Sequence, residues 1–88
     1  MQALIRELSR GERAALEAHF LALRAEDRRL RFGVALNDSS VSGYLERIDF
    51  ERDALFGVSG DDLRLVGVAH VARGDGHAEL GVSVLESE

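Results

Sequence analysis

The sequence has no cysteine, no proline, no tryptophan and no lysine. The lack of cysteine excludes disulfides and thiolate chemistry. No apolar run approaches the ~18 residues that a membrane-spanning helix needs, and residues 1–7 lack the basic stretch and apolar core of a secretory signal. We therefore expect a cytoplasmic protein with no membrane segment.

The charge balance argues against a nucleic-acid partner. The net charge is −5, every positive side chain is an arginine, and no basic cluster stands clear of acidic residues. A nucleic-acid surface usually needs a stripe of positive charge. The length of 88 residues fits one small domain, and a hydrophobic content of 45% is ordinary for a globular protein.

The first half of the sequence predicts helices after a short segment at 3–8, which is either an edge strand or a helix lead-in. Ser9 and Glu12 have the spacing of a capping box and predict a helix from 10 to about 24. Its apolar stripe contains Leu16, Phe20 and Leu23.

Two further helices are expected before the chain changes to strands. The charged segment 26–32 predicts a short helix with Leu30 facing inward and Gly33 ending it. Ser39 or Ser40 is then expected to cap a third helix. Its apolar residues have the spacing i, i+3, i+4 and i+7, and they are Val41, Tyr44, Leu45 and Ile48.

The second half of the sequence predicts an antiparallel meander of three strands, at 54–58, from 63 to 72, and at 77–85. A Gly-Asp-Gly turn at 74–76 joins the last two. The whole order is strand, helix, short helix, helix and three strands, which is an α+β fold.

A tight loop at 74–75 is expected to pair Ala72 with His77, which places His70 opposite Glu79. In this register one face of the hairpin is wholly apolar, and we expect that face to be buried because a slip of one residue would bury Glu79. The residues expected on the buried face include Ala69, Val71, Leu80 and Val82.

The order of elements and the residues of the last two strands resemble the first half of the GNAT superfamily of N-acetyltransferases. In that family the third strand typically contains a run like LVGVA, found here at 65–69. The fourth strand often begins with Ala-Glu followed by alternating apolar residues, as at 78–84. Bacterial members have a helix like YLER, found at 44–47, before the second strand. The resemblance covers nearly the whole chain.

One diagnostic element of that family is missing from the sequence. The family has a Gln/Arg-x-x-Gly-x-Gly/Ala loop after its fourth strand, whose backbone N–H groups at a helix N-terminus hold the coenzyme A pyrophosphate. The sequence reads Glu-Ser-Glu at 86–88, where that loop should begin. We therefore expect the N-terminal part of a GNAT fold, inactive by itself.

The resemblance implies a role for four residues of the last strand. Glu79 would accept the proton of the attacking amine, and main-chain groups near Val82, Ser83 and Val84 would bind acetyl-CoA and polarise its acetyl carbonyl. The alternative is a purely structural role, in which Glu79 pairs with His70 and the two valines are core residues. Two imidazoles and one carboxylate, from His70, His77 and Glu79, are a possible zinc-ligand set. We interpret them instead as polar side chains on the surface of a sheet, and we expect no metal.

The implied activity is transfer of an acetyl group from acetyl-CoA to an amine that the sequence does not identify. The alternative is a non-catalytic half-domain that acts by self-association or by binding a small ligand. The strand at 77–85 has no proline or lysine to protect its edge, so we expect a homodimer joined through it or through the face beside it.

Overall fold

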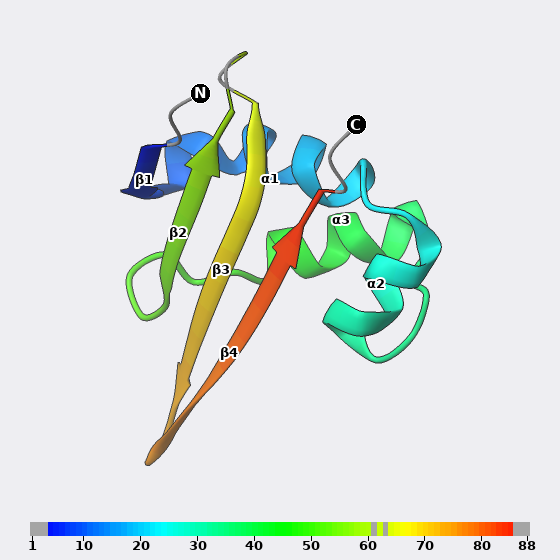
Figure 1. Ribbon diagram of the computed structural model, residues 1–88. Helices are drawn as coiled ribbons and strands as arrows, with labels where there is room; N and C mark the ends of the chain where they lie inside the picture. Colours follow the sequence, from blue (N-terminus) through cyan, green and yellow to red (C-terminus); the bar gives the residue numbers. More distant parts are fainter. Residues whose placement is uncertain (1–3, 61, 63, 86–88) are drawn as a thin grey trace.

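The computed structural model describes residues 4–60, 62 and 64–85, and Figure 1 shows their arrangement. The order of the elements confirms the expected α+β fold, and the strand expected to begin at 63 has its first residue outside the described part of the chain. The elements are β1 (Leu4–Glu7), a 3-10 turn η1 (Arg10–Glu12), α1 (Arg13–Leu21), α2 (Ala25–Phe32), α3 (Asp38–Glu46), β2 (Ala54–Ser59), β3 (Leu65–Gly74) and β4 (His77–Val84).

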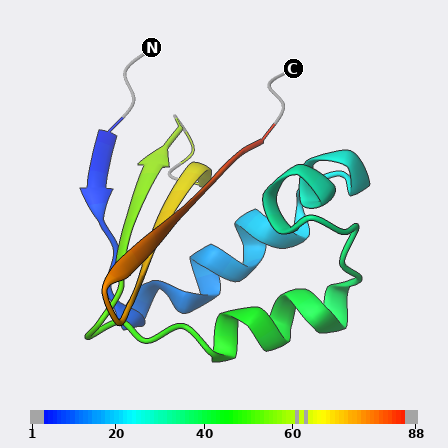
Figure 2. The same ribbon diagram turned by 90° about the horizontal axis from the view of Figure 1, so that it is seen from below.

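The four strands form one antiparallel sheet in the order β1-β2-β3-β4. The first segment is thus an edge strand, paired with β2. Figure 2 shows the helices gathered on one side of the sheet. The core lies between these layers and is built around Leu16, Phe20, Val41, Leu45, Leu55, Leu65 and Val68. Among the described residues, no helix is both long enough and apolar enough to cross a bilayer.

The helix ends follow the predicted signals in part. The capping box at Ser9 is present, with the Ser9 backbone N–H donating to the Glu12 carboxylate at 3.1 Å. α2 ends before Gly33, as predicted. The prediction of a serine cap for α3 is wrong, because Asn37 is the cap and its Oδ1 accepts from the Ser40 N–H at 2.8 Å.

The inward residue of α2 is Arg28, not Leu30. Leu30 is 85% exposed, whereas Arg28 is 9% exposed. The Arg28 guanidinium donates to the carbonyls of Leu21 at 2.9 Å, Leu23 at 3.2 Å and Leu36 at 2.8 Å. These carbonyls lie at the end of α1 and in the loop after α2, where they need donors that a leucine does not have.

The predicted hairpin register is wrong by two residues. Gly74 pairs with His77, so the loop is Asp75-Gly76 and His70 lies opposite Gly81. Asp-Gly is a favoured two-residue hairpin loop because its second position takes positive φ, and Gly76 has φ 75°.

The predicted buried face is also wrong. Val68, His70 and Ser83 face the helices and are buried, whereas Leu80 and Val82 are 68% and 56% exposed. The alternation of a strand fixes which residues share a face, but helices from elsewhere in the sequence decide which face is covered. Here the helices bring polar partners to His70 and Ser83, so the mixed face is the buried one.

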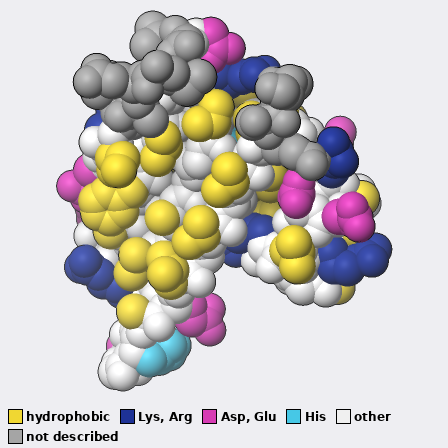
Figure 3. Space-filling view, viewed as in Figure 1, with side chains coloured by type: hydrophobic (Ala, Val, Ile, Leu, Met, Phe, Trp, Pro, Cys, Tyr) yellow, Lys and Arg dark blue, Asp and Glu magenta, His cyan; other side chains and the backbone are white. Residues whose placement is uncertain are grey.

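The side of the sheet away from the helices is apolar and uncovered. We call it the open face, and Figure 3 shows its hydrophobic side chains spread over the strands. Its large exposed members are Ile5, Phe56, Leu80, Val82 and Val84.

Candidate functional site

The free edge of β4 is the first part of the candidate site. Among the described residues β4 has one sheet neighbour, β3, and the Leu85 N–H donates to the Val66 carbonyl at 2.8 Å. In an antiparallel ladder, alternate residues direct their N–H and C=O groups toward the neighbouring strand. Ser83 therefore bonds toward β3, whereas the backbone groups of Val82 and Val84 point to the free edge.

Ser83 has a second role that the sequence did not indicate. Its hydroxyl lies 2.8 Å from Nε2 of His19, and Nδ1 of His19 lies 3.0 Å from the Leu65 carbonyl. A carbonyl only accepts, so Nδ1 carries the proton and Nε2 accepts from Ser83 in the neutral imidazole. Burial lowers the pKa of His19, and the bond to Leu65 opposes this only in part. The pair ties α1 to the sheet.

Glu79 lies toward the hairpin end of β4, opposite Ala72, and is exposed. The expected contact with His70 does not form because of the two-residue shift in register. Glu79 is therefore an accessible carboxylate on the strand, separate from the buried polar groups.

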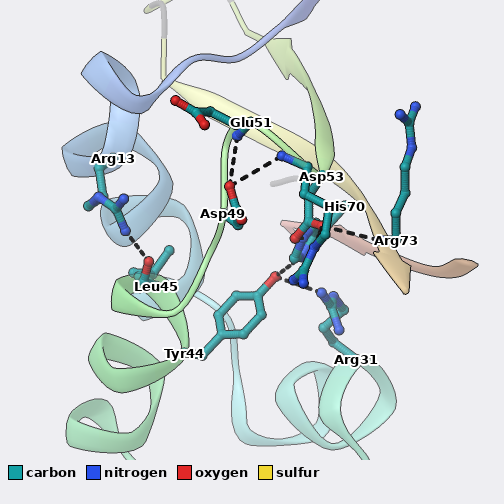
Figure 4. A network of polar contacts seen from close by, with 10 residues as sticks. Arg13, Arg31, Tyr44, Leu45, Asp49, Glu51, Asp53, His70 and Arg73 are labelled. Atoms are coloured by element: carbon teal, nitrogen blue, oxygen red, sulfur yellow. Dashed lines mark hydrogen bonds and ion pairs between the residues drawn. The ribbon is translucent and has the colours of Figure 1, made fainter. Parts of the chain in front are cut away.

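A buried polar cluster lies beneath β3, where β3 faces α3. His70 Nε2 is 2.9 Å from Asp53 Oδ2, and His70 Nδ1 is 2.6 Å from the Tyr44 hydroxyl (Figure 4). We call these three residues the polar triad. When Asp53 is ionised it can only accept, so Nε2–H donates to Asp53 and the Tyr44 hydroxyl donates to Nδ1.

Arg31 of α2 completes this cluster. Its Nη2 donates to the Tyr44 hydroxyl at 2.8 Å, and its Cζ lies 5.3 Å from the centre of the Tyr44 ring. The guanidinium also lies against Gly81 of β4, where a Cβ would collide with it. Because Gly81 has no side chain, α2 and the Arg31 guanidinium can approach β4 at the position next to Val82.

The two ends of the triad, Asp53 and Tyr44, have different protonation states because their surroundings shift their pKa values in opposite directions. Burial alone would raise the pKa of Asp53, but hydrogen bonds from His70, from the Arg73 backbone N–H and from Arg52 lower it below its ordinary value. Burial raises the pKa of Tyr44, and the Arg31 charge opposes the rise. At neutral pH the triad therefore has a carboxylate at one end and a phenol at the other.

The sequence pattern does not indicate the triad, because the helical spacing places Tyr44 in an apolar stripe and the predicted register pairs His70 with Glu79. The inward position of Tyr44 was the available signal, since a buried tyrosine hydroxyl usually has a partner. The zinc alternative does not form, because His77 lies at the hairpin end opposite Gly74. No group of three metal-ligating side chains occurs within residues 4–60, 62 and 64–85.

Comparison with solved structures shows that the chain has the GNAT fold. It superposes on the crystal structure of the GNAT domain of S. lividans PAT with a TM-score of 0.69 and 16% identity. The match covers 96% of this chain and 54% of that chain, so the protein spans about half the length of the matched domain. No protein-family model and no curated protein matches the sequence.

Proposed function

We propose that the chain is the N-terminal part of an N-acetyltransferase that transfers the acetyl group of acetyl-CoA to an amine. The GNAT fold supports this proposal, and the observation that carries it is the free edge of β4. Val82 and Val84 present backbone groups there, in the part of the strand where the family resemblance places the acetyl-CoA arm.

The proposed chemistry is direct acyl transfer. The amine nitrogen attacks the acetyl carbon, and a backbone N–H at the β4 edge stabilises the oxyanion that develops. Glu79 is the proton acceptor that the family resemblance implies, and its exposed carboxylate is open to an approaching ammonium group. Ser83 contributes through its bond to His19, which fixes β4 against α1.

Backbone amides of β4 give a direct test. In ¹H–¹⁵N spectra at millimolar acetyl-CoA, we expect the amide signals of Val82 and Val84 to shift, because their N–H groups face the free edge. The amides of Gly81 and Ser83, which point toward β3, are the internal comparison. Shifts confined to other strands, or none at all, would contradict the proposed site.

The affinity is expected to be weak, because the sequence lacks the backbone cradle for the pyrophosphate. In calorimetric titration we expect a dissociation constant weaker than about 100 μM, a free energy of about −5.5 kcal/mol or less favourable. A micromolar constant would show that the 88 residues hold the pyrophosphate in another way.

The second candidate function is a non-catalytic half-domain that acts by association. The open face favours it, because five large apolar side chains on one surface are unusual for a chain that works alone. The NMR experiment separates the two functions, since association alone predicts no response to acetyl-CoA at the β4 edge.

A further inference from the structure

We propose that the polar triad is an acyl-accepting site, in which the Tyr44 hydroxyl attacks the acyl carbon of an activated ester or thioester. This goes beyond acetyl transfer to an amine, and it does not depend on coenzyme A binding. The inference rests on the geometry of Tyr44, His70 and Asp53 and on the charge of Arg31.

The three side chains have the arrangement of an activated nucleophile. The 2.6 Å separation between the Tyr44 oxygen and His70 Nδ1 allows direct proton transfer, and the 2.9 Å bond to Asp53 orients the imidazole. Nucleophile, base and orienting carboxylate within hydrogen-bond reach of one another are the general signature of covalent catalysis. Asp53 is a positioning residue here, since it acts only through His70.

Arg31 stabilises negative charge on the attacking oxygen. Its Nη2–H already donates to the Tyr44 hydroxyl. Its Nε–H is buried and has no partner among the described residues, so the guanidinium retains a donor beside the phenol. A buried donor without a partner is uncommon, and an acyl oxygen would supply the missing acceptor.

The step balances without a further reactant. A bond forms between the Tyr44 oxygen and the acyl carbon, while the bond from that carbon to the leaving oxygen or sulfur breaks. The phenolic proton passes to His70 Nδ1, and Asp53 stabilises the imidazolium until it releases the proton to water. The products are an O-acyl tyrosine and the free alcohol or thiol.

The composition makes this step easy to observe. Tyr44 is the only tyrosine, and the sequence has no lysine and no cysteine to compete for an acyl group. The other nucleophiles of the chain are the serine hydroxyls, the imidazoles and the terminal amine, and peptide mapping distinguishes them from Tyr44. A mass increase of one acetyl group on the peptide that contains Tyr44 is therefore a direct readout.

The test uses the 88-residue chain and p-nitrophenyl acetate, with N-acetyltyrosine amide as the reference nucleophile. We expect Tyr44 to be acetylated on the order of 100-fold faster than the reference, the size of effect that a positioned base gives. Acetylation of Tyr44 no faster than the reference, or acetylation only at other residues, would overturn the proposal.

Two pairs of variants separate chemistry from structure. His70→Gln should reduce acetylation of Tyr44 to about the reference rate, whereas His77→Gln, at the exposed hairpin end, should leave it unchanged. A folded His70→Gln protein with the wild-type rate would refute the role of His70. If that variant unfolds, the wild-type comparison with the reference still decides the matter.

The positioning role of Asp53 is tested spectroscopically. The ¹⁵N shifts of the His70 ring should report a proton on Nε2 in the wild type and its loss from that position in Asp53→Asn. The same tautomer in both proteins would remove Asp53 from the proposal. Neither measurement involves coenzyme A, so a failure here leaves the proposed acetyltransferase function untouched.

Discussion

Without acetyl-CoA, the 88-residue chain is expected to sediment as a dimer at micromolar concentration, joined through the free edge of β4 and the open face beside it, so that acetyl-CoA and the second copy compete for this edge. An edge strand without lysine, proline or a bulge is a template for another strand. Within β4 the backbone groups of even-numbered residues face this edge. A second β4 can therefore pair with them in an antiparallel manner about a two-fold axis.

The open face strengthens this expectation. The side chains of Leu80, Val82 and Val84 all lie on it and are 56% to 68% exposed. Because residues that pair across such an edge place their side chains on the same face, the apolar rows of two copies become one continuous surface. Contact between the two rows of apolar side chains removes apolar area from water in both copies.

Val82→Lys tests the dimer. The substitution adds a charge to the paired strand of each copy, so the loss of apolar contact occurs twice and should weaken association by about 100-fold or more. Leu30→Lys is the matched control, because it makes the same charge change at an 85% exposed leucine of α2, on the side of the sheet opposite the open face. A wild-type monomer, or equal sedimentation of both variants, would refute the interface.

Acidification from pH 7.5 to pH 5.5 is expected to destabilise the fold through His19. The imidazole is fully buried, and burial lowers its pKa in the folded state below the ordinary value of about 6.5. Below pH 6.5 the unfolded chain binds a proton that the folded chain does not. Stability is therefore complete above pH 6.5 and falls with decreasing pH, by at most about 1.4 kcal/mol per pH unit.

Urea unfolding at the two pH values measures this effect. His19→Gln should lower stability at pH 7.5 by about 1–3 kcal/mol, because Ser83 and the Leu65 carbonyl lose good partners, and should flatten the pH dependence. His77→Gln, exposed at the hairpin, should keep the wild-type dependence. An unchanged slope in His19→Gln would exclude His19 as the cause.

The sequence by itself indicated the three helices, the last three strands and their order, but it left open whether the segment at 3–8 is a strand. The capping box at Ser9, the spacing of the apolar residues of α1 and α3, and the alternation along β3 and β4 are local signals. Each acts between residues a few positions apart, so each is legible without knowledge of the fold. The resemblance to the GNAT family followed from this order and from the residues of β3 and β4, and the superposition confirms the fold.

Only the tertiary structure decided which face of the hairpin is buried and which polar groups meet. The two-residue shift depends on the Asp75-Gly76 loop, and the covered face depends on where the helices pack. Tyr44 and His70 are 26 residues apart, and His19 and Ser83 are 64 apart. Such contacts form because packing brings distant segments together, and a polar side chain on an inward face is stable only when packing supplies its partner.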